Sequence, residues 1–289
     1  MVKAAAELLC FPDEAISHLS KQYNTLIRHT ECEIALKIAA TEFINGDGNG
    51  YTEKLDHIST TLGIPRYTVD MLMLLLAVEP TRDKYRERGL PDSVCRDTMS
   101  DLKNKLIECY NVYGCWGTFV TWWFRCHTQL RLFTLGRLQY EPIAFPYDSY
   151  KGVLKKGDTV YNCHIPSGGA LSEESVLDSF RRAYDFFEAK GMFPIYCNSW
   201  LIYPPTAALY GENSNLRRFY EMYDIINAVK DDKMKNFWHI FDTPYSREAL
   251  ENAREDNSLR RAFKKYLLEG GSMGNGQGII LFDGEKIIK

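Results

Sequence analysis

Apolar residues recur at helical spacing through the first part of the chain, up to about residue 130. This spacing places them on one face of a helix, and Gly-rich breaks separate the expected helices. Ser100 is a candidate N-cap for one of them. The expected helices are Glu31–Ile44, Tyr51–Leu62, Val69–Val78, one starting near Ser100, and an aromatic-rich buried helix over Trp116–Leu132. The pattern predicts an all-α N-terminal domain over residues 1–130.

Beyond residue 130 the pattern changes to short apolar runs with partial alternation, which is typical of strands. Amphipathic helical segments lie between these runs. The expected strands are Leu132–Phe145, Thr159–Ile165, Phe193–Tyr203, Asn236–Phe241 and Gly278–Phe282, and the expected helices are Ser172–Lys190, Asn213–Val229 and Ser246–Leu268. Strands that alternate with helices predict an α/β domain over residues 131–289. The expected fold class is therefore α+β, with two domains.

Composition and charge exclude several function classes. The chain has 289 residues, of which 45% are hydrophobic, and 35 Lys and Arg against 38 Asp and Glu give a net charge of −3. This balance argues against broad nucleic-acid binding, which needs a basic face. The longest apolar run, Met71–Val78, is far shorter than the roughly 20 residues of a membrane span. The N-terminus lacks the pattern of a secretory signal. We expect a cytoplasmic protein that binds neither nucleic acid nor membrane.

No metal site is expected. The eight cysteines form no C-x-x-C pair, so the sequence indicates free thiols rather than a zinc ribbon. Residues 45–56 follow part of the spacing of an EF-hand loop. Asn45 stands where the first Asp is usual, and Asp56 replaces the bidentate Glu. This segment is therefore interpreted as a Gly-rich connection between helices.

The segment His164–Ser175 (HIPSGGALSEES) joins an expected strand to the start of an expected helix. The free N–H groups of such a turn, together with the helix dipole, favour an anion. Gly168 and Gly169 let the backbone approach a phosphate closely. A plain strand-to-helix turn explains the same residues. The segment carries neither a Walker A sequence nor the G-x-G-x-x-G fingerprint of dinucleotide binding.

The order of these elements resembles the GNAT superfamily of acyl-CoA-dependent N-acyltransferases. Its pyrophosphate loop has Gln or Arg, two free positions, Gly, one free position, then Gly or Ala. Gly168 and Ala170 match this pattern, whereas Ile165 replaces the leading Gln or Arg. The resemblance implies a mixed-sheet GNAT-like fold and acetyl-CoA or another acyl-CoA as co-substrate. The residues implied at the cofactor are Ile165, Ser167, Gly168, Gly169, Ala170, Leu171 and Ser172.

A second motif supports the resemblance. GNAT proteins often carry N-x-x-A-x-x-x-Y-E on the helix after the next strand, and residues 213–221 (NSNLRRFYE) depart from it only at Leu216. The resemblance implies that Tyr220 protonates the departing thiolate of coenzyme A, and it places Asn213 near the cofactor. A phenol hydroxyl can donate a proton to sulfur, which suits this role.

The whole chain also resembles a group of uncharacterised bacterial acyltransferase domain-containing proteins. These combine a helical N-terminal domain with a GNAT-like C-terminal domain. The residues that carry this resemblance are Asp97–Leu102, Leu135–Glu141, His164–Pro166 and Cys197–Leu201. The group implies a fold and a reaction type but no particular acceptor.

Candidate groups for the chemistry lie on the expected strands. Glu141 ends an apolar run and is the candidate general base, although a strand-edge Glu paired with a cation is an alternative. His164 and Cys163 are adjacent, so they point to opposite faces of a strand and His164 is assigned to the acceptor side. In the GNAT architecture the following strand separates from its neighbour to admit the pantetheine arm. This places Asn198, Ser199 and Trp200 at the substrate.

The sequence therefore predicts an acyl-CoA-dependent N-acyltransferase that transfers an acyl group, expected to be acetyl, to a small-molecule amine. The amine would attack directly in a ternary complex. One alternative is a non-catalytic GNAT-fold protein that senses a ligand or binds a partner. Another is a ping-pong enzyme in which Cys163 carries the acyl group.

Overall fold

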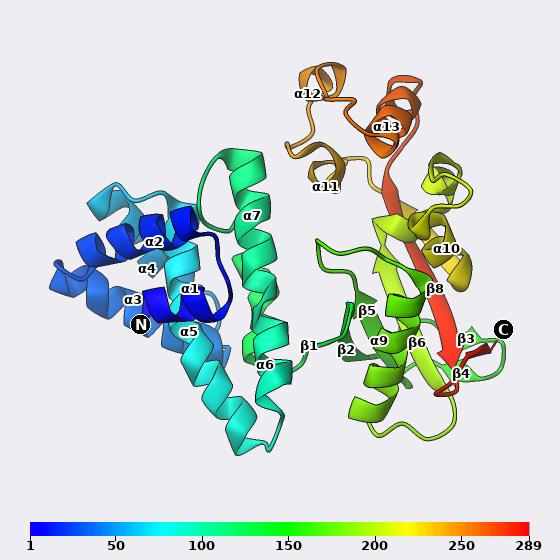
Figure 1. The fold of residues 1–289 in the computed structure, drawn as a ribbon, viewed down its shortest axis with the longest axis horizontal. Coiled ribbons are helices and arrows are strands. Elements are labelled where there is room, and N and C mark those ends of the chain that lie inside the picture. Colours follow the sequence, from blue (N-terminus) through cyan, green and yellow to red (C-terminus); the bar gives the residue numbers. More distant parts are fainter. Residues whose placement is uncertain (289) are drawn as a thin grey trace. The chain divides into compact units, whose positions relative to one another are not determined.

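The computed structural model describes residues 1–288, which form two compact units, Met1–Phe133 and the residues from Thr134 onward. Helices make up the first unit, and a mixed sheet with helices makes up the second (Figure 1). This confirms the two-domain α+β fold class.

The first unit is built around α5 (Arg66–Glu87), whose middle is buried without interruption from Thr68 to Val78. The sequence predicted only this buried middle, because the exposed residues after Val78 and the internal Pro80 break the apolar pattern. The other helices are α1 (Val2–Leu8), α2 (Asp13–Leu26), α3 (Thr30–Asn45), α4 (Gly50–Leu62), α6 (Asp92–Met99) and α7 (Asp101–Tyr113). Helices α1, α3, α4 and α6 all contact α5. The apolar face of each thus packs against one central helix.

The predicted long helix over Trp116–Leu132 is wrong. This segment contains a loop, a 3-10 turn η1 (Thr121–Phe124) and a short α8 (Arg125–Thr128). The start of the segment bonds to the start of α5: Thr118 N donates to Tyr67 O at 3.0 Å, and Thr68 Oγ1 donates to Trp116 O at 3.0 Å. The aromatic residues that suggested a buried helix include Trp122, whose side chain is 65% exposed.

The second unit contains a sheet in the order β1-β2-β5-β6-β8-β7, and β9 pairs with β8. Its strands are β1 (Phe133–Leu135), β2 (Leu138–Ala144), β5 (Thr159–His164), β6 (Phe193–Ser199), β7 (Asp224–Lys230), β8 (Gly274–Phe282) and β9 (Ile287–Ile288). A hairpin of β3 (Ser149–Tyr150) and β4 (Leu154–Lys155) packs on one face. Helix α9 (Glu173–Phe186) covers the other face, where Ser179 contacts Tyr140 of β2 (Figure 1). Strands β5 and β6 pair in parallel.

Two predicted elements of this unit are wrong. The predicted helix Asn213–Val229 ends early as α10 (Asn215–Met222), and its second half is edge strand β7. The β-branched residues Ile225, Ile226 and Val229 favour this strand. The predicted strand Asn236–Phe241 is the short helix α11 (Trp238–Phe241). Its buried residues Phe237, Ile240 and Phe241 follow helical spacing, which strand composition concealed.

Helices α11, α12 (Arg247–Glu251) and α13 (Ser258–Leu268) lie between β7 and β8 in the chain. They enclose an apolar cluster that contains Phe237, Leu250 and Phe263. The predicted single helix over residues 246–268 is thus two helices, because Asn257 caps α13 by accepting a bond from Arg260 N at 2.9 Å.

Alternate glycines of β8 allow other segments to cross the strand closely. Gly274, Gly276 and Gly278 lie on one face, since strand residues alternate. A Cβ at Gly276 would overlap the carbonyl of Ile202, in the 3-10 turn η2 (Trp200–Ile202) that follows β6. A Cβ at Gly278 would lie 3.0 Å from Tyr223 Cβ. The glycine-rich run Gly270–Gly278 therefore belongs in large part to β8 and packs against η2 and the end of α10. Its composition alone would suggest a flexible connection.

We expect Gly276→Ala to lower the free energy of unfolding by about 2 kcal/mol or more, because overlap with a backbone carbonyl cannot be relieved by a rotamer change. Gly211→Ala is the matched control, since no atom lies within 4 Å of a Cβ there. Urea denaturation of the two variants measures the difference. Equal stability of both variants would contradict close packing of η2 on β8.

Candidate active site

Strands β5 and β6 separate within the sheet. They pair only at Tyr161–Ile195 and Asn162–Tyr196. Each strand continues to pair on its outer side, up to Gln139–His164 in β2–β5 and up to Ser199–Gly276 in β6–β8. The last residues of β5 and β6 are therefore held by their outer neighbours and not by each other. The two strands thus diverge beyond these pairs, which leaves an opening in the sheet where no residue pair joins β5 to β6 within residues 1–288.

The turn from β5 into α9 has the geometry of an anion site. Gly168 and Gly169 have φ values of 84° and 71°, a region that favours glycine. The N–H groups of Gly168, Gly169, Ala170 and Leu171 donate no hydrogen bond to any residue in 1–288. Ser172 is the N-cap of α9, and its Oγ accepts a bond from Ser175 N at 3.3 Å. Four free donors thus precede the positive end of a 14-residue helix.

Arg137 contacts this turn, and the sequence analysis did not identify it as a site residue. Arg137 Nε donates to Ala170 O and Nη2 donates to Gly169 O, both at 3.2 Å. The two segments are more than 30 residues apart, so no local pattern could have paired them. By contrast, the side chain at Ile165, where the GNAT motif has Gln or Arg, offers no polar group.

Glu141 and His164 lie together on the sheet face opposite α9. Glu141 pairs with Asn162, and Gln139 with His164, in the β2–β5 register. His164 Nε2 lies 3.8 Å from Glu141 Oε2 and 3.0 Å from Asn162 Nδ2. The side chains of His164 and Glu141 are 22% and 18% exposed, so a ligand can reach both. The pair lies where β5 separates from β6, and it offers a carboxylate and an imidazole as proton acceptors.

The same face carries further polar groups that the sequence analysis missed. Gln277 pairs with the exposed Asn198 and lies beside Asn227, whose Nδ2 donates to Gln277 Oε1 at 2.8 Å. Tyr147 Oη also donates to Gln277 Oε1. Tertiary pairing alone aligns these residues, because they come from β6, β7, β8 and a loop.

The opposite face, under α9, is buried at the same level of the sheet. Cys163 and Cys197 are fully buried there, and burial raises the pKa of the Cys163 thiol to about 12. The hydroxyl of Tyr223, just after α10, lies beside both thiols, and burial raises its pKa well above the usual value. These groups stay protonated at neutral pH. A Cys163 thiolate nucleophile is therefore not supported.

Tyr220 lies on α10, half-buried against the apolar cluster of α11 and α13. The Arg217 guanidinium lies 5.8 Å from the centre of its ring. Its neighbour in the motif, Asn213, is exposed, and Ser214 instead caps α10 through a bond from Arg217 N at 3.1 Å.

Two other predicted substrate residues have structural contacts. Ser199 Oγ accepts a bond from Leu201 N at 3.2 Å and thereby caps η2. The ring of Trp200 stacks on His239 at 5.9 Å and packs edge-on to Phe263. The structure therefore brings Glu141, His164 and Asn198 to one face, whereas Trp200 lies in the apolar cluster.

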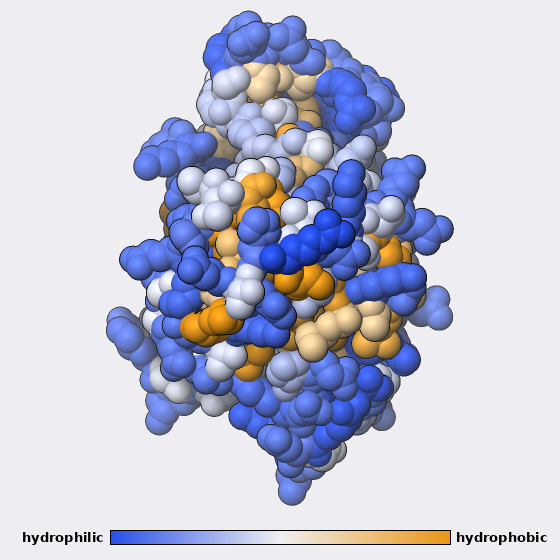
Figure 2. Space-filling model, turned by 90° about the vertical axis from the view of Figure 1, so that its left-hand side faces the viewer, coloured by the Kyte–Doolittle hydropathy of each residue, from blue (hydrophilic) through white to orange (hydrophobic). Residues whose placement is uncertain are grey.

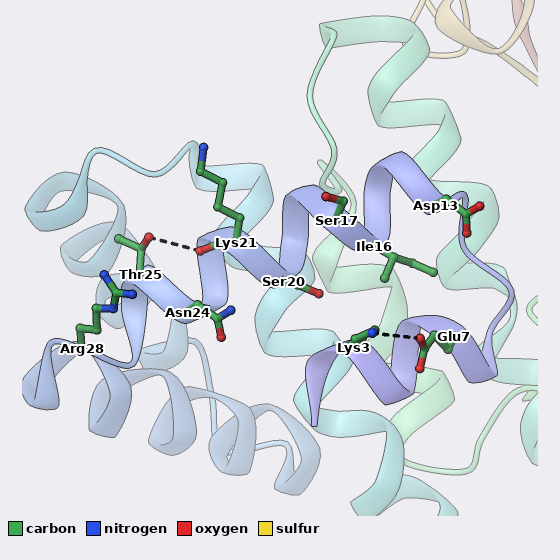
Figure 3. Close-up of a pocket in the computed structure, with 10 residues that line it drawn as sticks. All are labelled: Lys3, Glu7, Asp13, Ile16, Ser17, Ser20, Lys21, Asn24, Thr25 and Arg28. Carbon is green, nitrogen blue, oxygen red and sulfur yellow. Dashed lines mark hydrogen bonds and ion pairs between the residues drawn. The ribbon is translucent and has the colours of Figure 1, made fainter.

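The helical unit has an open polar hollow of about 770 Å³ between α1 and α2 (Figure 3). Lys3, Lys21 and Arg28 line it together with Glu7 and Asp13. Figure 2 shows small apolar patches separated by polar side chains on one face, and Ile34 and Ile38 of α3 are among the exposed apolar residues of this unit. Within residues 1–288, no group of three or more His, Cys, Asp or Glu is placed to hold a metal ion. None of the helices described is long and apolar enough to cross a membrane.

Two family models match the chain. The N-acyltransferase N-terminal domain matches residues 2–130, and the GNAT-like C-terminal domain matches residues 132–280, more than half of the chain. The chain belongs to the GNAT-like acyltransferases. The resemblance found in the sequence is thereby confirmed, and with it the expectation of an enzyme that transfers acyl groups. No curated protein matches this acyltransferase.

Solved structures of acyltransferases share the fold. An acyltransferase in complex with decanoyl-CoA and teicoplanin is 20% identical, with a TM-score of 0.77 over 96% of this chain and 86% of that one. An acyltransferase mutant in complex with octanoyl-CoA is 19% identical, with a TM-score of 0.75 over 95% and 85%. Both matches extend over the helical unit as well as the sheet.

We expect acyl-CoA alone to leave Cys163 unmodified, because a buried thiol with a pKa of about 12 supplies almost no thiolate at neutral pH. Intact-mass analysis after incubation with acetyl-CoA and decanoyl-CoA tests this. The exposed Cys10 is the internal comparison: iodoacetamide labels it in the folded protein and labels Cys163 only after unfolding. A stable acyl adduct on Cys163 would establish the ping-pong alternative.

Proposed function

We propose that this acyltransferase transfers an acyl group from acyl-CoA to the amine of a small molecule, by direct attack in a ternary complex. The observation that carries the proposal is the separation of β5 and β6 beside a turn with four free N–H groups. The opening suits an extended thioester arm with amide groups, since unpaired strand edges can bond to amides. The turn suits the negative charge at the other end of such a donor.

The residues proposed at the donor are those of the turn and the start of α9. Gly168, Gly169, Ala170 and Leu171 offer backbone N–H groups to the pyrophosphate, and Ser172 with the first turn of α9 adds the helix dipole. Ile165 and Ser167 border the turn. Asn213 is proposed nearby from its place in the motif.

Glu141 and His164 are the proposed acceptor-side groups. The sequence predicted Glu141 as the base, and the 3.8 Å separation makes the two residues a proton-accepting unit in which the carboxylate stabilises a charged imidazole. They lie on the face opposite Cys163, so the amine approaches from the side of the sheet away from α9. Asn198 and Ser199 are proposed along the same edge of the opening, with Trp200 beyond them.

Tyr220 is the proposed proton donor to the departing thiolate. Its motif position and its place on α10 support this role, whereas Tyr223, just after α10, is buried. The non-catalytic alternative predicts no turnover in any variant, so the same variants decide between the two functions.

The acyl chain and the acceptor are proposed only as classes. Acetyl was predicted from the sequence, whereas related folds have been solved with octanoyl-CoA and decanoyl-CoA. A further structure of this fold holds teicoplanin together with decanoyl-CoA, which supports a small-molecule acceptor. A donor series from acetyl-CoA to decanoyl-CoA against a panel of amines measures both.

We expect Ala170→Glu to weaken coenzyme A binding by about 10-fold or more, because a carboxylate beside the turn repels the pyrophosphate. Ala170→Gln is the matched control, since it adds the same bulk without charge and Ala170 is exposed. Calorimetry with coenzyme A measures both affinities. Failure of the wild type to bind would reject the proposed donor, and equal affinities of the two variants would reject the proposed pyrophosphate position.

We expect Glu141→Gln, His164→Gln and Tyr220→Phe each to lower kcat by about 100-fold while leaving coenzyme A affinity within a few-fold of the wild type. The reason is that each removes a proton-transfer group and leaves the turn intact. Tyr245→Phe is the control for loss of a tyrosine hydroxyl, because Tyr245 is 37% exposed between α11 and α12. A kcat for Tyr220→Phe equal to that of Tyr245→Phe would show that Tyr220 is not the acid.

A further inference from the structure

If the β5–α9 turn binds an anion, its carbonyl oxygens must point away from that anion. A turn binds an anion only when its N–H groups face the ligand and its C=O groups do not. Four N–H groups of this turn have no partner within residues 1–288, but that alone does not fix their direction. The two hydrogen bonds of Arg137 do.

Each bond of Arg137 orients one peptide plane. In a trans peptide the C=O and the following N–H point in opposite directions. Holding Gly169 O toward Arg137 therefore turns the N–H of Ala170 away from it, and holding Ala170 O does the same for the N–H of Leu171. One guanidinium thus fixes the direction of two neighbouring donors.

The backbone on both sides of Arg137 is held by hydrogen bonds to α9. Arg137 lies in the β1–β2 connection, and Ser179 of α9 bonds to the residues on both sides of that connection. Leu138 N donates to Ser179 Oγ at 3.1 Å, and Ser179 Oγ donates to Leu135 O. Ser179 is fully buried. The β1–β2 connection is therefore held to the body of α9 by Ser179 and to the turn before α9 by Arg137.

The charge of Arg137 is not balanced by the protein. Among residues 1–288, Arg137 forms no ion pair with any carboxylate, and its guanidinium is partly buried. Burial lowers its pKa, in contrast to the raised pKa of ion-paired Arg82. A desolvated cation without a counter-ion is costly, and an anion bound at the turn would reduce that cost.

We propose that Arg137 is the positioning residue of the pyrophosphate turn. This chain has Ile165 where the GNAT motif has Gln or Arg, and Arg137 supplies a guanidinium to the turn from the β1–β2 connection instead. It acts through the backbone: its fork holds two carbonyls so that two N–H groups face the pyrophosphate, and its charge lies behind the turn. This inference rests on the proposed function, since it takes coenzyme A as the ligand.

The test compares coenzyme A with pantetheine, which lacks the pyrophosphate. We expect Arg137→Met to weaken coenzyme A binding by about 10- to 100-fold, the range of lost charge-assisted bonds, and to leave pantetheine binding unchanged. Arg137→Lys should recover part of the loss, because it keeps the charge but cannot span two carbonyls. Arg181→Met, an exposed site on α9, is the control for loss of one positive charge and should match the wild type.

Several outcomes overturn the inference. If Arg137→Met binds coenzyme A as tightly as Arg181→Met, Arg137 does not position the turn, while the proposed function stands. Equal weakening of coenzyme A and pantetheine would show a general loss of structure, which melting curves of the variant would reveal. If Arg137→Met does not fold, Arg137→Lys decides, since affinity equal to the wild type contradicts a two-carbonyl fork. A wild type that binds no coenzyme A removes both the inference and the proposed donor.

Discussion

Strand β6 is paired unequally on its two sides, and the arrangement of the second unit depends on this. It forms seven residue pairs with β8 and only two with β5. Full pairing with β8 holds the end of β6 firmly, so the separation from β5 is a fixed feature of the sheet and not a frayed end. Strand edges are normally paired or covered, and here the diverging ends of β5 and β6 form no residue pair with each other within residues 1–288, beside a helix N-terminus. This is why we propose the opening as the site of the acyl donor.

The two faces of β5 carry different chemical groups at the level where it separates from β6. Because residues alternate along a strand, Cys163 faces the buried side under α9, and Asn162 and His164 face the opposite side. The buried side holds groups that burial keeps protonated, whereas the opposite side holds a partly exposed carboxylate and imidazole. Proton acceptors are thus confined to one face. In the proposed function, the acceptor amine and the acyl donor therefore approach the same opening from different directions.

Close packing on β8 makes this arrangement possible. Small residues at Gly276 and Gly278 allow η2 and the end of α10 to lie directly on the strand. The chain leaves β6, crosses β8 through η2 and then forms α10, which contacts η2. A side chain at these positions would push α10, and with it Tyr220, away from the sheet. The glycines therefore contribute to the site without touching it.

The sequence by itself determined the division into a helical and an α/β part, the strand–turn–helix segment around Gly168, and the two motifs of the family. These are local features, since periodicity, turn residues and short motifs are written in consecutive positions. It was wrong for β7 and α11, where β-branched and aromatic residues fit either element and tertiary contacts decided between them. It identified Glu141 and His164 separately, but only the β2–β5 register brings them within 3.8 Å. The contacts of Arg137 could not be predicted for the same reason. Its partners lie more than 30 residues away, and backbone carbonyls leave no signature in a sequence.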